Sequence, residues 1–143
     1  MLDTLYSQIG LLPMVLVGIL AFAKGDEPER LAMGAYILGW MAAMLFQDIA
    51  KLHGSWQAAV LALDMVMLTV FGGLAWKYRR TWPVWAAALQ LIIVMSHLVI
   101  LIDFRVGMRA FYTVLNLASY GILAAIGIGS FWAWQERRAA GLE

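Results

Sequence analysis

The chain contains no cysteine and unusually few charged side chains. Of its 143 residues, 13% are Asp, Glu, Lys or Arg and 64% are hydrophobic. The lack of cysteine excludes disulfides, thiolate metal sites and cysteine nucleophiles. A soluble domain is about one quarter charged and about half apolar, so the composition excludes an ordinary water-exposed globule. A disordered chain is excluded as well, because disorder requires low hydrophobicity and high charge.

The remaining class is an integral membrane protein, and the mean hydropathy of +0.80 agrees with it. The formal net charge is only +1, which gives no reason to expect nucleic acid as a partner. The length allows one domain covering residues 1–143. The sequence therefore predicts a single transmembrane domain.

Five apolar runs interrupted by short charged segments predict the architecture. A helix that crosses a bilayer needs roughly 20 mostly apolar residues. The runs lie at about 9–23, 31–50, 56–76, 82–102 and 110–133. Such short links make consecutive helices antiparallel neighbours. We expect an all-α polytopic bundle with five transmembrane helices.

The basic residues are distributed unequally between the two sides of this bundle. The side with the N-terminus and the second and fourth links has three: Lys51, Arg105 and Arg109. The other side has seven: Lys24, Arg30, Lys77, Arg79, Arg80, Arg137 and Arg138. The positive-inside rule puts the C-terminus inside and the N-terminus outside. Five tryptophans at the inner boundary are expected to act as interfacial anchors: Trp76, Trp82, Trp85, Trp132 and Trp134.

Two of the expected helices carry small residues four positions apart. These residues are Ala35, Gly39 and Ala43 in the second helix, and Gly121, Ala125 and Gly129 in the fifth. Small residues let helix backbones approach closely, and this packing replaces the missing hydrophobic drive between helices in lipid. The spacing predicts helix contacts along both seams, either within the chain or between subunits.

Polar residues at membrane depth are the candidates for function, because ionisable groups there are costly. From the helical rise, Asp64 lies roughly 12 Å, His97 roughly 8 Å and Asn116 roughly 9 Å below the outer edge. The pocket candidates are Asp64, His97, Asn116, Tyr120, Gln57, Gln90, Asp48 and Asp103. Gln57 and Asp64 share one face of the third expected helix, Gln90 and His97 one face of the fourth, and Asn116 and Tyr120 one face of the fifth. We expect these three polar faces to line one pocket in the outer half of the bilayer. Asp64 should lie within a water's reach of His97 or Asn116.

Structural roles for the same residues stay open at this point. Asn116 and Tyr120 could be hydrogen-bonding contacts between helices, each worth about 0.6–2 kcal/mol. Asp103 could be a solvated loop charge, and His97 a hydrogen-bonded core histidine. Asp64 could be protonated in its buried position or paired with His97.

The chain has no motif typical of hydrolysis or of a metal site. It contains neither an HExxH run nor a serine in a glycine-flanked turn. Two histidines and no cysteine argue against a zinc site. A haem b would need His53 and His97 as its two ligands, at depths that differ by roughly 8–10 Å, so haem is a weak candidate and the cofactor is left open. The missing catalytic motifs disfavour an enzyme.

These observations favour a small binding or assembly protein of a bacterial inner membrane. Its partners would be membrane lipids together with other membrane subunits or further copies of the chain, because it has short loops and no soluble domain. It would therefore act as an accessory subunit or an oligomer. The alternative is a haem-bearing or proton-handling membrane protein that uses Asp64 and His97.

Overall fold

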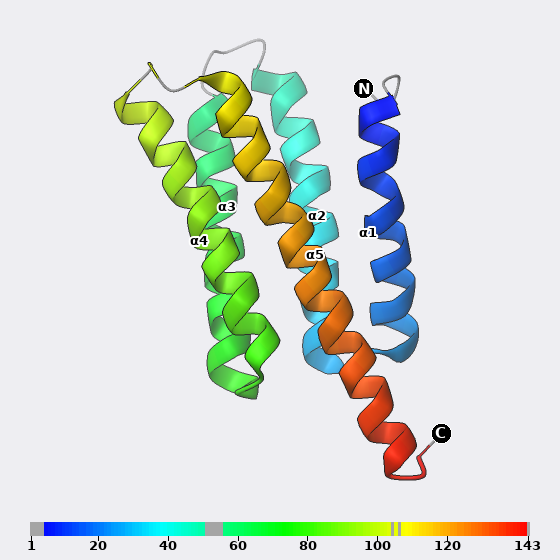
Figure 1. Cartoon of the computed structure of the whole chain (residues 1–143). Helices are drawn as coiled ribbons and strands as arrows, with labels where there is room; N and C mark the ends of the chain where they lie inside the picture. The colour runs from blue at the N-terminus through cyan, green and yellow to red at the C-terminus, as the bar shows by residue number, and fades with distance from the viewer. Residues whose placement is uncertain (1–4, 51–55, 104, 106, 143) are drawn as a thin grey trace.

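The structure is a computed structural model that describes residues 5–50, 56–103, 105 and 107–142, with side chains described for 10–46, 57–103, 105 and 107–142. The described residues form an all-helical bundle without strands (Figure 1). The helices are α1 (Leu5–Lys24), α2 (Glu27–Ala50), α3 (Trp56–Tyr78), α4 (Thr81–Ile102) and α5 (Met108–Ala139).

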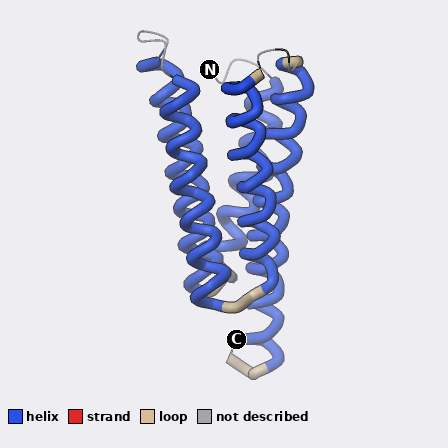
Figure 2. The backbone as a smooth tube through the Cα atoms, turned by 90° about the vertical axis from the view of Figure 1, so that its left-hand side faces the viewer, coloured by secondary structure: helices blue, strands red, loops and turns tan. Residues whose placement is uncertain are grey.

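Consecutive helices run antiparallel and pack side by side, and α5 closes the bundle by packing against α1 (Figure 1). A smaller contact joins α2 to α5. The start of α1 and the C-terminus lie at opposite ends of the bundle, and α5 projects beyond the other helices at the C-terminal end (Figure 2). We call this the C-terminal end of the bundle; it also holds the α1–α2 and α3–α4 turns.

Three of the helices are long and apolar enough to cross a membrane. They are the described part of α3 (Gln57–Tyr78) together with α4 and α5. The described part of α1, Gly10–Lys24, is a shorter apolar helix. In α2, Glu27 and Glu29 occupy the first turn and shorten the apolar part of the helix. The helices thus indicate a membrane protein.

The second helix begins four residues earlier than the expected start at residue 31. The backbone N–H of Arg30 donates to the carbonyl oxygen of Asp26 at 3.1 Å, which makes Asp26 the residue that caps α2. The Glu29 carboxylate in turn accepts the backbone N–H of Asp26 at 2.9 Å, as in a capping box. Pro28 in the first turn lacks only an N–H that would have no helical partner. The charged segment is therefore the first turn of α2.

The fifth helix is also longer than expected, because it continues past residue 133 to Ala139. The residues that follow the apolar run include Gln135, Glu136, Arg137 and Arg138, which are good helix formers. Basic residues in the last turn also interact favourably with the helix dipole. The apolar run therefore ends before the helix does.

Both small-residue seams face a neighbouring helix within the chain. A Cβ atom at Gly39 would lie 3.1 Å from Sδ of Met67 on α3. At Gly121 it would lie 2.7 Å from Leu89, and at Gly129 2.5 Å from Trp82, both on α4. These glycines allow side chains of the neighbouring helix to pack directly on the backbone.

Candidate functional site

A half-buried acidic side chain and a buried histidine meet between α3 and α4. Oδ2 of Asp64 lies 3.2 Å from Nδ1 of His97. The side chains are 17% and 5% exposed, respectively. The depths estimated from the sequence placed these two residues at nearly the same level, and the structure places them in contact.

Gln90 completes this group from the same face of α4. Its Nε2 donates to Oδ1 of Asp64 at 2.9 Å and lies 3.3 Å from the Asp64 carbonyl oxygen. Gln90 and His97 are seven residues apart, so they share one stripe of α4 roughly 10 Å long. Asp64 is held between them, and we call these three residues the Asp64 site.

The surroundings of His97 indicate which ring nitrogen carries a proton. Nδ1 lies 3.1 Å from the carbonyl oxygen of Ile93 and 3.2 Å from Asp64. Both neighbours are acceptors when Asp64 is ionised, so Nδ1 is assigned as a donor. The hydrogen bond goes to Ile93, while Oδ2 of Asp64 is buried without a hydrogen bond of normal geometry. Gln90 thus stabilises one oxygen of the Asp64 carboxylate by a hydrogen bond. His97 lies near the other oxygen without a hydrogen bond of normal geometry.

The fifth helix contributes an aromatic wall to this site. The ring of Phe111 packs edge-on against His97, with centroids 5.2 Å apart and an interplanar angle of 89°. His97 and Gln90 are 4% and 3% exposed. The Asp64 site is therefore enclosed by helix packing and lines neither of the two grooves described below.

The predicted polar stripe of α5 does not join the Asp64 site. Asn116 and Tyr120 are exposed, and Tyr120 lies next to α1, 3.5 Å from where a Cβ of Gly10 would be. The face of α5 that packs inward includes Phe111 and Ala118. Asn116 is two residues from Ala118, which is about 200° around a helix. The expectation that all three stripes face one interior space is therefore wrong for α5.

The other pocket candidates are not brought to the Asp64 site either. Gln57 is half-buried one stripe position before Asp64. Asp103 is exposed at the end of α4, where its carboxylate accepts the backbone N–H of Arg105 at 2.9 Å. The side chains of Asp48 and His53 lie outside the described residues.

A second charged cluster lies at the C-terminal end of the bundle, and its members were not among the candidate site residues. Glu29 is completely buried and accepts hydrogen bonds from Nη1 of Arg80 at 2.9 Å and from Nε1 of Trp82 at 2.7 Å. Arg80 also donates to Asp26 at 2.8 Å. Arg137 on α5 pairs with the other oxygen of Asp26 and donates to the carbonyl oxygen of Lys24.

This cluster ties together both turns and the projecting part of α5. Partial burial lowers the pKa of Arg80, but the Asp26 hydrogen bond and the nearby carboxylates of Glu29, Asp26 and Glu136 outweigh it, so the pKa is raised. Arg80 therefore stays charged. Its role is to neutralise two acidic residues at the start of α2.

Trp82 differs from the expected interfacial anchor. It is only 6% exposed, whereas Trp76, Trp85 and Trp132 are 86%, 69% and 62% exposed. The buried indole meets the Gly129 position and donates to Glu29. The sequence signal for this cluster was the Asp26-x-x-Glu29 spacing, which matches a capping box.

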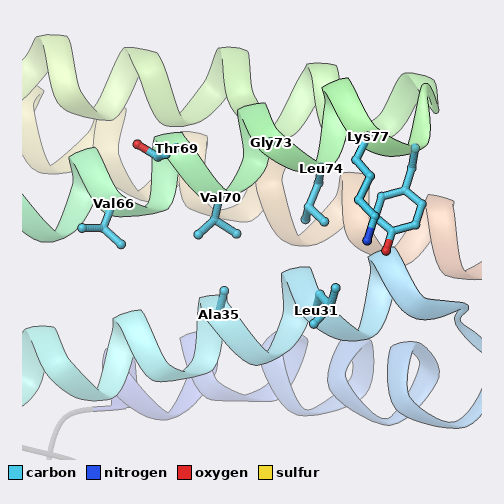
Figure 3. Close-up of a pocket in the computed structure, with 9 residues that line it drawn as sticks. Leu31, Ala35, Val66, Thr69, Val70, Gly73, Leu74 and Lys77 are labelled. Atoms are coloured by element: carbon cyan, nitrogen blue, oxygen red, sulfur yellow. The ribbon is translucent and has the colours of Figure 1, made fainter.

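Two open grooves run between neighbouring helices, and both are lined mainly by apolar side chains. One lies between α2 and α3, has a volume of about 740 Å³ and ends at Lys77 and Tyr78 (Figure 3). The other lies between α4 and α5, has a volume of about 410 Å³ and includes Met95 and Phe111. The Asp64 site thus lines neither groove, and both grooves are apolar.

The described residues offer no cluster of three or more His, Asp or Glu side chains suited to a metal ion. His97 is engaged by Ile93, Asp64 and Phe111 rather than facing an open cavity.

Comparisons of the chain with protein-family models, with curated proteins and with solved structures find no match.

Proposed function

We propose that the protein is a small binding or assembly protein of a bacterial inner membrane, acting as an accessory subunit or an oligomer. The observation that carries this proposal is the separation of polar and apolar surfaces. The Asp64 site is enclosed, whereas both grooves are apolar and open. An enzyme needs reactive groups that a substrate can reach, and an assembly protein needs surfaces that partners can cover.

The proposed membrane topology has five spans, with the N-terminus outside and the C-terminus inside. Seven of the ten basic residues belong to the C-terminal end of the bundle. Several of them pair with acidic residues, including Arg80 and Arg137. The positive-inside rule counts Lys and Arg rather than net charge, so these pairs leave the orientation unchanged.

The mass of the protein after mild extraction from its native membrane tests the assembly role. Light scattering corrected for detergent should give a protein mass above the 15.9 kDa of one chain. The excess should be a whole number of further chains or a second defined subunit. A single chain at 15.9 kDa across several mild detergents would refute the assembly role.

The contact between Asp64 and His97 favours a second candidate, a proton-handling protein. A carboxylate and an imidazole 3.2 Å apart can share or exchange a proton, and ionisable residues at membrane depth often mark proton relays. Infrared difference spectra between acid and alkaline pH should show a carboxylic-acid band that is absent in Asp64→Asn. Identical spectra for the two proteins would refute this candidate.

A further inference from the structure

The α2–α3 groove has the shape and charge of a lipid site. We infer that it binds one anionic phospholipid of the inner leaflet, with an acyl chain along the groove and the phosphate at Lys77. The inference rests on the proposed membrane location and orientation, and it adds a defined ligand and a defined site. Figure 3 shows Val66 and Val70 of α3 facing Leu31 and Ala35 of α2 across this groove.

The length of the groove favours a lipid chain over a partner helix. Its lining on α3 runs from Val66 to Lys77, eleven residues that rise roughly 16 Å. The hydrocarbon core of a bilayer is about 30 Å thick, so the groove covers one leaflet. A transmembrane helix of another subunit would need a complementary face across both leaflets, whereas an acyl chain extends through only one.

Gly73 makes room for this chain in the wall of the groove. A Cβ atom at Gly73 would meet no other atom within 4 Å. The lining has almost no polar surface apart from its inner end, since Thr69 donates its hydroxyl to the carbonyl oxygen of Met65 within the same helix at 2.9 Å. An apolar occupant therefore meets no unsatisfied polar group along the groove.

Polar groups suited to a phosphate lie at the inner end of the groove. The Lys77 ammonium is 3.9 Å from a carboxylate oxygen of Glu27, and these side chains are 66% and 67% exposed. Such a loose surface pair is weak, so the ammonium can bind a second anion. The buried Tyr78 hydroxyl makes no hydrogen bond of normal geometry. The Lys77 ammonium lies beside this hydroxyl and over the ring, 4.8 Å from its centroid. Basic pockets between helices on the cytoplasmic side bind anionic headgroups.

The chain offers matched variants that separate the acyl-chain site from the charge. Gly73→Leu fills the groove, whereas Gly72→Leu places the same side chain at an adjacent open position that does not line it. Both changes replace helical glycine by a better helix former, so neither should prevent folding. Lys77→Gln removes the headgroup charge, and Arg138→Gln removes one charge from the same end outside the groove.

The experiment reconstitutes the protein in phosphatidylcholine vesicles and measures association with spin-labelled phosphatidylglycerol or spin-labelled phosphatidylcholine. The wild type should prefer phosphatidylglycerol by roughly fivefold, the effect of one lysine at an anionic headgroup. Lys77→Gln should lose this preference but still immobilise a lipid chain. Gly73→Leu should immobilise fewer chains of both lipids, and both controls should behave as the wild type.

Two results would overturn the lipid site. Equal lipid binding by Gly73→Leu and Gly72→Leu would show that the groove does not hold a chain. A change of oligomeric state in Gly73→Leu without a change in lipid binding would assign the groove to a second copy. A wild-type protein that stays in the vesicles without preferring phosphatidylglycerol refutes the lipid site alone, whereas a protein that alkali extracts from the vesicles refutes the proposed membrane function.

Discussion

The buried carboxylate of Glu29 should contribute more to stability than any exposed acidic residue of the chain. We consider Glu29→Gln, which keeps the shape of the side chain and removes its charge. In the wild type one oxygen accepts from Arg80 and Trp82, and the other accepts the backbone N–H of Asp26. The amide group of Gln has one acceptor oxygen and one donor nitrogen, so at least one of these three donors loses its partner.

The magnitude follows from the burial of each group. A hydrogen bond to a charged group contributes about 1.5–3 kcal/mol, and an unsatisfied buried donor costs about 1–3 kcal/mol. Arg80 is 32% exposed and keeps Asp26 as a partner, so water screens part of the loss. We therefore expect Glu29→Gln to lower the free energy of unfolding by about 2–4 kcal/mol.

Glu27→Gln is the matched control, because it makes the same substitution two residues away. Glu27 is 67% exposed and lies 3.9 Å from Lys77, so the expected loss is about 0–1 kcal/mol. The free energies come from equilibrium unfolding in mixed micelles of a mild detergent and dodecyl sulfate, followed by circular dichroism. Equal stabilities of the two variants would refute the assignment of Glu29 as a buried, charged anchor of α2.

Three further predictions use the same unfolding assay. Gly129→Leu should lower the free energy of unfolding by about 1–3 kcal/mol, because its Cβ would lie 2.5 Å from Trp82; wild-type stability would show that α4 and α5 do not pack closely there. His97→Ala should cost more alone than in an Asp64→Asn background, by about 0.5–3 kcal/mol, and additive effects would contradict an energetic coupling of the pair. Asn116→Leu should change stability by no more than about 0.5 kcal/mol, since Asn116 is exposed, and a larger loss would show that its amide is buried and bonded.

The helical class and the order of the helices could be predicted from the sequence, because long apolar runs with charged ends admit few other structures. The contact of Asp64 with His97 was also within reach, since helical rise alone places both side chains at a similar depth. The five-span topology and the roles of these residues stay predictions.

The rotation of α5 could not be read from its polar residues alone. Asn116 and Tyr120 share a stripe, but the packing of Ala118 and Gly129 determines which face of α5 turns inward. In a membrane a helix can leave single polar side chains at its surface when close packing gains more. The depth of a polar residue in the membrane is therefore easier to predict than the side of the helix bundle that its side chain faces.

The charged cluster at the C-terminal end could not be predicted from the sequence for a different reason. Charged residues next to apolar runs usually lie in solvent, and only three-dimensional packing brings Arg80 and Arg137 to Asp26. The spacing of Asp26 and Glu29 contained the local part of the signal, the start of α2. The long-range part required the structure.

The central claim is that this chain is a membrane bundle with its C-terminal end inside, and the absence of cysteine permits a direct test. Single cysteines replace Asp3, Arg105 and Leu142, and intact cells are treated with a membrane-impermeant maleimide. Asp3→Cys and Arg105→Cys should be labelled, and Leu142→Cys should react only after the membrane is permeabilised. Labelling of Leu142→Cys in intact cells, or labelling of Asp3→Cys only after permeabilisation, would contradict the claim.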